Sequence, residues 1–342
     1  MSQFPTPRLR RTLVLYKLAW IVLFPALLVY LALRGRKDPT YLRHMGERFG
    51  RYAPLSGAVW VHAVSLGEVR SAVPLIRAYL ARGERVVVTH FTPAGRSETE
   101  RAFGAEIAAG KLRAVWVPFE FRWCYRRFFR AFSPKFGLVL EIEVWPEMVL
   151  SARAAGVPLF LCNAQYPQKS LVKDEGRARA DLMRGYAGAL VKSDLQKARF
   201  AGVGVSRIAV TGELRFDQPI PPGLVARGED LRVTLGGRPV VTIASAVEGE
   251  DALYIETIGS ARRTYADKGL APPLFVYVPR APDRFDDVAD MLSRTGLKVL
   301  RRSQALSPEL TPQADIAGVD VLLGDSLGEM YFYIALCDTA LE

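Results

Sequence analysis

One carboxylate, Glu68, stands where an α/β protein would place a reactive group. It follows a β-branched and aromatic run at 59–62 and a Ser-Leu-Gly turn, and apolar residues at helical spacing come after it. This pattern predicts a buried strand, a tight turn and a helix, and open α/β sheets bind ligands at such strand ends. Ser65 and Glu68 also have the S-x-x-E spacing of a helix capping box. The segment alone therefore leaves two roles open for Glu68, a catalytic carboxylate or a cap that bonds backbone N–H groups.

A second acidic group follows a later predicted strand. Glu141, Glu143 and Glu147 surround the Trp-Pro pair at 145–146. Carboxylates at this place could orient a sugar or bind a cation. The alternative is that they are solvated charges around the start of a helix.

Three polar segments in the last third of the chain also follow predicted strands. Residues 245–250 could present backbone N–H groups to a phosphate. Arg280, with Arg284 four residues on, offers guanidinium groups that suit phosphate or carboxylate. In the third segment, Ser326 and Glu329 are predicted to form a second capping box that opens a helix. The repetition of these three polar segments at strand ends predicts a nucleotide or phosphosugar site.

Alternating strand and helix patterns must position these groups. At 342 residues the chain exceeds the size of one typical core, and the βα alternation predicts parallel sheets covered on both faces. A Pro-rich stretch is the best candidate linker, and two such domains would leave a cleft for a ligand. The predicted strands lie at 59–62, 86–89, 138–141, 159–163, 188–191, 239–245, 274–280, 298–300 and 319–323. The predicted divisions are 1–37, an N-terminal anchor; 38–216, a first domain; 217–223, the linker; and 224–342, a second domain.

Residues 12–33 form a near-continuous apolar stretch of about the length that crosses a bilayer. Arginines and a lysine flank both ends, so the positive-inside rule gives no direction. We expect a membrane anchor that spans the bilayer or lies in its interface; the alternative is a buried helix of a soluble protein. The formal charge of +11 indicates an anionic partner. The spacing of the three cysteines indicates neither a metal nor a disulfide framework, which favours the cytoplasmic side.

A basic and aromatic segment at 122–130 is predicted to be a helix. Its rings and guanidinium groups would suit lipid headgroups or single-stranded nucleic acid. The alternative is an ordinary amphipathic helix with Phe128, Phe129 and Phe132 in the core and its arginines in solvent. With an anchor upstream, the membrane interpretation is favoured over nucleic acid.

The order of motifs resembles the Kdo (3-deoxy-D-manno-oct-2-ulosonic acid) transferases, membrane-associated GT-B glycosyltransferases of Gram-negative bacteria. The resemblance covers nearly the whole chain. The matching motifs are RGRK (34–37), GERFG (46–50), HAVSLGE (62–68), TPAG (92–95), EIEVWP (141–146), NA (163–164), TGELRFD (211–217), PRAPDRF (279–285), RS (302–303) and GDSLGE (324–329).

The resemblance implies a GT-B-like α/β fold of two Rossmann-like domains behind the anchor helix, an acceptor domain and a nucleotide-sugar domain. It implies inverting transfer of Kdo from CMP-Kdo to a lipid A precursor in lipopolysaccharide biosynthesis, at the cytoplasmic face of the inner membrane. Glu68 would be the general base, and no metal or other cofactor is expected. The implied donor-binding residues are Ser245, Glu248, Gly249, Arg280, Ser326, Gly328 and Glu329, and the implied acceptor-binding residues are Ser65, Gly67, Glu141, Glu143, Asn163 and Arg215.

The chain departs from the family pattern at three positions. Ala281 and Val247 replace histidines that the family usually carries on the donor side, and Gln165 replaces an arginine. The family pattern also continues beyond Glu342, so the second domain is expected to be incomplete here. Two alternatives remain: a paralogue that uses another nucleotide sugar, and a noncatalytic anchored module that binds anionic lipid or nucleic acid.

Overall fold

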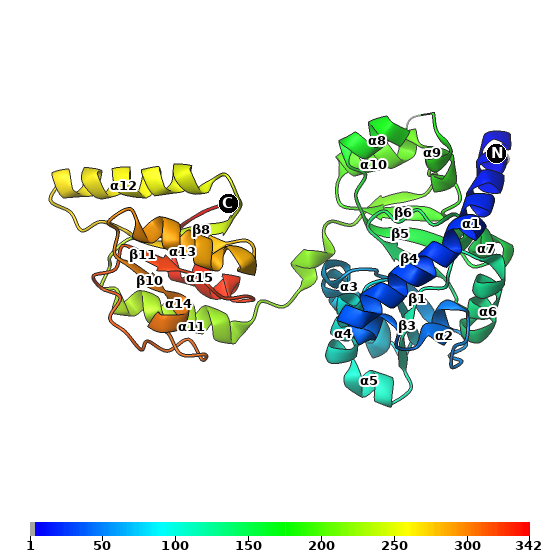
Figure 1. The fold of residues 1–342 in the computed structure, drawn as a ribbon, viewed down its shortest axis with the longest axis horizontal. Coiled ribbons are helices and arrows are strands. Elements are labelled where there is room, and N and C mark those ends of the chain that lie inside the picture. Colours follow the sequence, from blue (N-terminus) through cyan, green and yellow to red (C-terminus); the bar gives the residue numbers. More distant parts are fainter. Residues whose placement is uncertain (1–3, 175) are drawn as a thin grey trace. The chain divides into compact units, whose positions relative to one another are not determined.

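Two α/β units make up the chain in the computed structural model, which describes residues 4–174 and 176–342 (Figure 1). The first unit is Met1–Gln218 and the second is Pro219–Glu342. The division between them falls inside the Pro-rich segment 217–223.

The first unit is built on a seven-stranded sheet in which every pairing is parallel. Its strand order is β3-β2-β1-β4-β5-β6-β7, so the order reverses between β1 and β4. Ligands bind at such a reversal in open α/β sheets. The strands are β1 (Val59–His62), β2 (Val86–His90), β3 (Leu112–Trp116), β4 (Gly137–Leu140), β5 (Leu159–Ala164), β6 (Gly188–Val191) and β7 (Ile208–Val210).

Helices cover both faces of this sheet because side chains alternate along each strand. Trp60 points to one face, where its ring centroid lies 4.7 Å from that of Phe128. Val61 points to the other face and packs with Val69 and Ile76. The helical segments are α2 (Met45–Arg48), α3 (Leu66–Ala81), α4 (Pro93–Ala102), α5 (Gly104–Ala108), α6 (Arg122–Phe132), α7 (Pro146–Ala154), α8 (Gln168–Asp174), α9 (Ala178–Met183), α10 (Asp194–Gly202), and the 3₁₀ turns η1 (Pro39–Tyr41) and η2 (Leu214–Asp217).

The second unit repeats the design with five parallel strands in the order β10-β11-β9-β8-β12. Val240, Val276 and Leu322 face one core cluster, and Ile243, Tyr277 and Leu323 face the other. The elements are α11 (Pro222–Thr234), β8 (Val240–Ala246), α12 (Asp251–Asp267), β9 (Leu274–Pro279), η3 (Pro282–Arg284), α13 (Phe285–Ser293), β10 (Val299–Arg301), α14 (Arg302–Ala305), β11 (Val321–Leu323), α15 (Met330–Leu336) and β12 (Thr339–Leu341).

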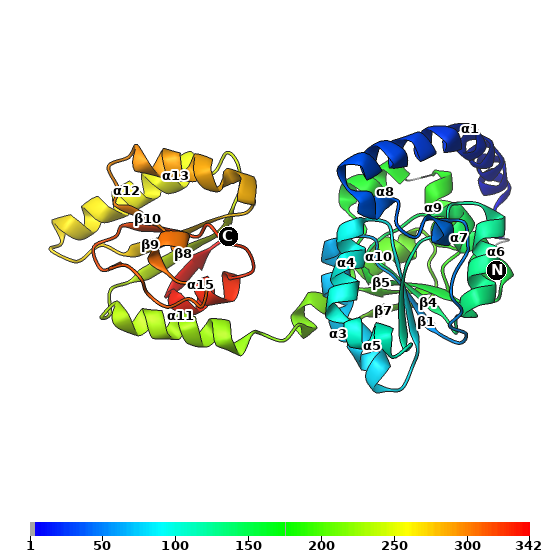
Figure 2. The same ribbon diagram turned by 60° about the horizontal axis from the view of Figure 1, so that its bottom comes forward.

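The apolar N-terminal stretch is a single helix, α1 (Pro7–Lys37), that continues through Pro25. It lies along the outside of the first unit (Figures 1 and 2). One side packs on the unit: the Phe24 ring lies 4.8 Å from Phe121 and 5.0 Å from Phe119. By length and composition the helix could cross a membrane, with a mean hydropathy of 2.1. The apolar residues of its exposed side include Val14, Leu15, Leu18, Ile21, Val22, Leu23, Val29 and Leu33.

The expected fold class is confirmed, and most predicted strands lie within a residue or two of the observed ones. Three short strands were not predicted: β3, β7 and β12. The basic and aromatic segment is α6, with Phe128, Phe129 and Phe132 buried and its arginines exposed. The three phenylalanines therefore belong to the core, whereas contact of the exposed arginines with lipid headgroups stays a prediction.

Candidate functional site

Glu68 lies in the first turn of α3, directly after the carboxyl end of β1. Ser65 caps this helix, since its hydroxyl accepts from the Glu68 N–H at 3.4 Å. Glu68 as a whole residue is 7% exposed. It accepts one hydrogen bond from the Val64 N–H at 2.8 Å and another from the Ser65 hydroxyl at 2.9 Å. The predicted cap is therefore present, and Gly67 lies exposed in the same turn.

Burial is the main cause that raises the pKa of Glu68 to about 7. Its hydrogen bonds from Val64 and Ser65 lower the pKa, and the negative charges of Glu143 and Glu141 raise it again. A carboxyl group with a pKa near neutrality can exchange a proton with a substrate at physiological pH. The position and the pKa together make Glu68 a candidate general base.

Glu141 and Glu143 follow β4, the strand next to β1 across the reversal of strand order. Glu141 is exposed and has a φ of +57°, and its N–H donates to the Cys162 carbonyl at 2.9 Å. A left-handed backbone is unusual for a residue other than glycine and clusters at functional sites. Glu143 accepts from the Trp145 indole at 2.6 Å, and burial raises its pKa. Carboxylates of both strands therefore meet at this edge of the sheet.

A cavity of about 660 Å³ lies beside this loop. Leu9, Leu13 and Tyr16 of α1 form one wall, and Glu143 with Arg179 supplies charge at another. The remaining lining residues are Thr12, Ile142, Val144, Trp145, Pro146, Ala178 and Leu182. The mixture of apolar walls and a few charged groups is typical of a ligand site.

Asn163 closes β5 and has a φ of +54°. Its amide donates to Glu213 at 3.0 Å, and its carbonyl oxygen accepts from the Leu214 N–H at 3.0 Å. Glu213 also pairs with Lys192 at 2.8 Å. Arg215 lies one residue beyond this contact and is exposed. The buried Asn163 thus connects the end of β5 to the TGELRFD segment. Its amide group is already hydrogen-bonded to Glu213 and Leu214.

In the second unit, Ser245 lies near the end of β8 at an irregularity in the pairing with β9. It has a φ of +60°, the third candidate residue in the left-handed region. Glu248 and Gly249 are exposed in the turn that follows, where Gly249 has a φ of +94°. The Val247 N–H donates to Glu250 at 3.0 Å. One of the backbone N–H groups expected to meet a phosphate is therefore used inside the turn.

Arg280 follows β9 on the neighbouring strand, and its side chain is exposed. Arg284 is instead committed to the structure: it donates to the Ala246 carbonyl at 2.7 Å and pairs with Asp251 at 2.6 Å. Asp251 also accepts from the Tyr277 hydroxyl at 2.7 Å. Of the two arginines, Arg280 is the one placed to meet a ligand.

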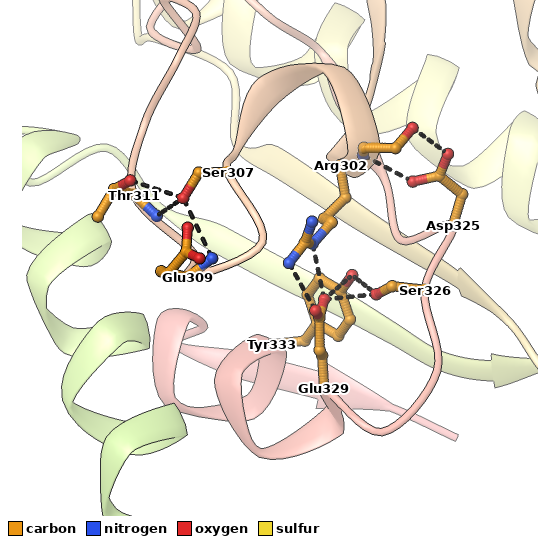
Figure 3. A network of polar contacts seen from close by, with 9 residues as sticks. Arg302, Ser307, Glu309, Thr311, Asp325, Ser326, Glu329 and Tyr333 are labelled. Atoms are coloured by element: carbon orange, nitrogen blue, oxygen red, sulfur yellow. Dashed lines mark hydrogen bonds and ion pairs between the residues drawn. The ribbon is translucent and has the colours of Figure 1, made fainter.

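The expected capping box of Ser326 and Glu329 is wrong, because the helix begins later than the box requires. Helix α15 begins at Met330, and Glu329 at its N-cap makes no side-chain capping bond. The Glu329 carboxylate accepts two hydrogen bonds from the buried Arg302, at 2.7 and 2.5 Å, and one from the Ser326 hydroxyl at 2.5 Å (Figure 3). A bidentate charged pair outcompetes a neutral cap. Gly328, with a φ of +83°, turns the chain between Ser326 and Glu329.

Further groups join this network. The Tyr333 hydroxyl lies 2.8 Å from the Ser326 hydroxyl, and Asp325 accepts from the Ser303 N–H at 2.9 Å and hydroxyl at 2.6 Å (Figure 3). The network links the ends of β10 and β11 with α15. Arg302 belongs to the RS motif (302–303), to which the sequence alone assigns no role.

Sequence reasoning missed other charged residues near these strand ends. Lys192, after β6, and the buried Glu120 stand alone in the sequence with no motif around them. In residues 4–174 and 176–342, no group of three or more His, Cys, Asp or Glu side chains is placed to hold a metal ion.

Comparisons with known proteins point to the same family over most of the chain. Residues 43–218 match a family described as 3-deoxy-D-manno-octulosonic-acid transferase (kdotransferase). The chain is 43% identical to the 3-deoxy-D-manno-octulosonic acid transferase of Bordetella pertussis, covering 86% of this chain and 68% of that protein. It is 26% identical to the protein of the same name from Haemophilus influenzae, covering 92% of this chain and 73% of that protein.

Among solved structures, a glycosyltransferase from Rickettsia africae has a similar fold, with a TM-score of 0.51 and 8% identity over 84% of this chain and 73% of that one. The C-terminal CMP-Kdo binding domain of WaaA from Acinetobacter baumannii is 27% identical, with a TM-score of 0.29, over 35% of this chain and 57% of that one.

Proposed function

This chain belongs to the 3-deoxy-D-manno-octulosonic acid transferase family and is a glycosyltransferase; from this premise we propose that it moves Kdo from CMP-Kdo to a lipid A precursor. The observation that carries the proposal is the buried Glu68 carboxylate at the end of β1, with a pKa of about 7. A noncatalytic lipid- or nucleic-acid-binding module does not agree with this family.

In the proposed reaction, Glu68 takes the proton of a primary hydroxyl on the acceptor sugar. The hydroxyl oxygen then forms a bond to the anomeric carbon of Kdo through an oxocarbenium-like state. The bond from that carbon to CMP breaks, and CMP leaves with the electron pair as an anion. Attack on the face opposite to CMP inverts the anomeric carbon. A general base of this kind contributes roughly 10²- to 10⁴-fold to the rate.

The donor side is assigned to the second unit. Arg280 is exposed at the end of β9 and supplies a cation for the phosphate of CMP. The turn of Glu248 and Gly249 follows the neighbouring strand β8, beside Ser245. Arg302 and the Ser326 hydroxyl both bond the Glu329 carboxylate, which fixes the turn that contains Gly328. Fixed positive charge and oriented donors stabilise the leaving phosphate as its charge develops.

The acceptor side is assigned to the first unit. Ser65 and Gly67 form the turn around the base, while Glu141 and Glu143 offer oxygens to sugar hydroxyls. Asn163 and Arg215 lie at the end of β5 and in η2. The cavity beside Glu143 has apolar walls from Leu9, Leu13 and Leu182, which suit hydrocarbon. These features fit an acceptor that carries both sugars and acyl chains.

We place the protein at the cytoplasmic face of the inner membrane, against an anionic lipid surface. The exposed side of α1 is mainly apolar from Val14 to Leu33, with Lys17 inside this stretch and arginines at both ends, while its other side packs on the first unit. A helix of this kind can lie in the membrane interface. The exposed arginines of α6 add the positive charge that anionic headgroups attract.

The test is a transfer assay with CMP-Kdo and a tetraacyl lipid A precursor. Parent protein is compared with Glu68→Gln, which can still accept the Val64 N–H but cannot take a proton at neutral pH. The exposed Glu229→Gln is the matched control. We expect Glu68→Gln to lose on the order of a hundredfold or more while Glu229→Gln matches the parent. Equal activity of Glu68→Gln and the parent removes the base assignment.

The same assay also tests which sugar donor the protein uses. Ala281 and Val247 stand where the family usually has histidines, which favours a second candidate, a transferase that uses a different nucleotide sugar. If the parent transfers nothing from CMP-Kdo but transfers another sugar, the donor assignment is wrong and this candidate replaces it.

A further inference from the structure

A second cavity, of about 170 Å³, lies between α1 and the segments that follow β2, β3 and β4 of the first unit. We call it the sub-helix cavity. Its polar residues are Arg48 and Glu120, and all its other walls are apolar or aromatic. Phe91 and Trp145 keep part of their surface exposed at its edge. The complete lining is Trp20, Leu27, Leu31, Arg48, Phe91, Val117, Pro118, Phe119, Glu120 and Trp145.

Arg48 is a buried cation that forms no direct ion pair within the described residues, although the charge of Glu47 acts on it. It is 2% exposed, and its guanidinium lies 4.3 Å from the centroid of the Trp116 ring. The neighbouring Arg96 stacks on the same ring at 5.2 Å but pairs with Glu47 at 2.6 Å. Within the described residues, no carboxylate lies within 4.0 Å of the Arg48 guanidinium. Burial lowers the pKa of Arg48 to about 10, so it stays protonated at neutral pH.

Two buried donors that line the cavity lack an acceptor in the described structure: Arg48 Nε and Trp20 Nε1. Across residues 4–174 and 176–342 the guanidinium makes one hydrogen bond, a long one of 3.4 Å to the Phe91 carbonyl, and it also lies over the Phe91 and Phe119 rings. Glu120, the one acidic side chain in the lining, is occupied elsewhere. It accepts from the N–H groups of Glu147 at 2.7 Å and Met148 at 3.1 Å.

Burying a charge without a partner is expensive, and cation–π contact offsets only part of that cost. Natural proteins break such rules mainly at functional sites, and there a ligand can supply the opposite charge. The missing partner must be an anion that can enter an apolar space, because hydrocarbon and aromatic side chains make up the rest of the lining. One wall of the cavity is α1, whose opposite side is the exposed apolar surface. A lipid brings an anionic group and a hydrocarbon chain together.

We propose that Arg48, with the Trp20 indole, binds the anionic headgroup of an acylated lipid whose hydrocarbon enters the sub-helix cavity. This inference rests on the proposed function, because the phosphorylated lipid acceptor is the first source of such a group; an anionic phospholipid is the second. Phe91 links the cavity to the candidate active site, since its N–H donates to the carbonyl of Val64, whose own N–H binds Glu68. The lipid's headgroup is thereby held within the same unit as the base.

The test measures binding without the donor, so it does not depend on catalysis. The probes are a tetraacyl disaccharide bisphosphate, the same molecule without phosphates, and vesicles of phosphatidylglycerol or phosphatidylcholine. The variants are Arg48→Met, which keeps the bulk and removes the charge, and Trp20→Phe, which keeps a ring and removes the N–H. The exposed Arg82→Met is the matched control.

We expect Arg48→Met to bind the bisphosphate roughly 10- to 100-fold more weakly, with unchanged binding of the phosphate-free molecule. Trp20→Phe should lose less, and Arg82→Met nothing. The Tm of ligand-free Arg48→Met should match or exceed that of the parent, since an unpaired buried charge has been replaced by an apolar side chain. If the loss appears on phosphatidylglycerol vesicles instead, the headgroup comes from the bulk lipid.

Two results would overturn the inference. One is a folded Arg48→Met that binds every probe like the parent. The other is a large fall in the Tm of both ligand-free variants with equal weakening on phosphorylated and phosphate-free probes, which assigns Arg48 to the scaffold. Failure of the proposed function gives a different result from failure of this inference. In that case the parent protein transfers no sugar, whatever the binding assays show.

Discussion

Ser65 and Glu68 hydrogen-bond to each other in both directions. The Ser65 hydroxyl donates to Glu68 Oε1 at 2.9 Å, and its oxygen accepts from the Glu68 N–H at 3.4 Å. The second carboxylate oxygen takes the Val64 N–H, one residue before the N-cap. Each carboxylate oxygen still has a free lone pair. Capping the helix and accepting a proton are therefore compatible roles for Glu68.

The pH dependence of transfer tests the role of Glu68. A base must be deprotonated to act, and the pKa of Glu68 is raised to about 7. We expect kcat/KM for the acceptor to rise about tenfold per pH unit below that value and to level off above it. Initial rates from pH 5 to 9 with saturating donor measure this profile. A flat profile between pH 5 and 8 contradicts the assignment.

Replacing Ser65 by alanine separates the cap from the base. The Ser65 hydroxyl lowers the pKa of Glu68, so its loss should move the midpoint of the pH–rate profile upward. Loss of the N-cap should also lower the free energy of unfolding of the first unit by about 1 kcal/mol. Ser65→Thr keeps a hydroxyl and serves as the control. A downward shift of the midpoint in Ser65→Ala would refute the electrostatic argument.

Glu141 holds a left-handed backbone at the end of β4, with a φ of +57°. Glycine takes this conformation freely, whereas alanine pays about 1 kcal/mol in steric strain. Glu141→Gly should therefore unfold at higher denaturant than Glu141→Ala, although both variants lack the carboxylate. Transfer activity should fall to a similar level in both if the carboxylate contacts the acceptor. Equal stability of the two variants would show that the strain is absent.

Arg302 and Glu329 form the best-connected buried pair described in the second unit, joined by two hydrogen bonds. Removing one partner of such a pair leaves an uncompensated charge, so Arg302→Met should destabilise this unit by about 3 kcal/mol. Hydrogen exchange of amides 321–336 measures the change locally. Arg227→Met breaks an exposed pair with Asp230 and should cost under about 0.5 kcal/mol. Comparable losses in the two variants would contradict the structural role of Arg302.

Local sequence patterns were sufficient to predict most of the fold. The apolar run before Ser65 and the S-x-x-E spacing after it predicted β1 and the start of α3, because the forces involved act over a few residues. The start of α15 was predicted wrongly because Arg302, distant in sequence, takes the Glu329 carboxylate. Short strands such as β12 also have no pattern of their own, since pairing with β8 defines them.

The candidate active site and the sub-helix cavity also depend on contacts between residues that are distant in the sequence. Glu68 could be identified from its own turn, whereas the raised pKa depends on burial and on Glu143 from another strand. Nothing around Arg48 in the sequence indicates a buried, unpaired cation. Its environment comes from α1, β3 and the segment after β3, which only the folded chain brings together.

Glu120 should make the first unit less stable as pH rises. Burial raises its pKa to about 7, against hydrogen bonds from Glu147 and Met148 that lower it. An unfolded glutamate has a pKa of about 4.3, so between the two values the folded state binds more protons than the unfolded state. Stability is then full below about pH 4 and is lost as the pH passes through about 7.

The size of this effect follows from the shift, which corresponds to on the order of 3 kcal/mol between pH 4 and pH 8. Glu120→Gln should flatten the pH dependence of unfolding, while Glu68 keeps a slope of the same sign. Tryptophan fluorescence isolates the first unit, because all five tryptophans of the chain lie in it. Urea unfolding at pH 5 and pH 8 of parent, Glu120→Gln and the exposed Glu229→Gln decides the point. A parent protein that gains stability from pH 5 to pH 8, with Glu120→Gln unchanged from it, would show that the buried carboxyl is ionised throughout.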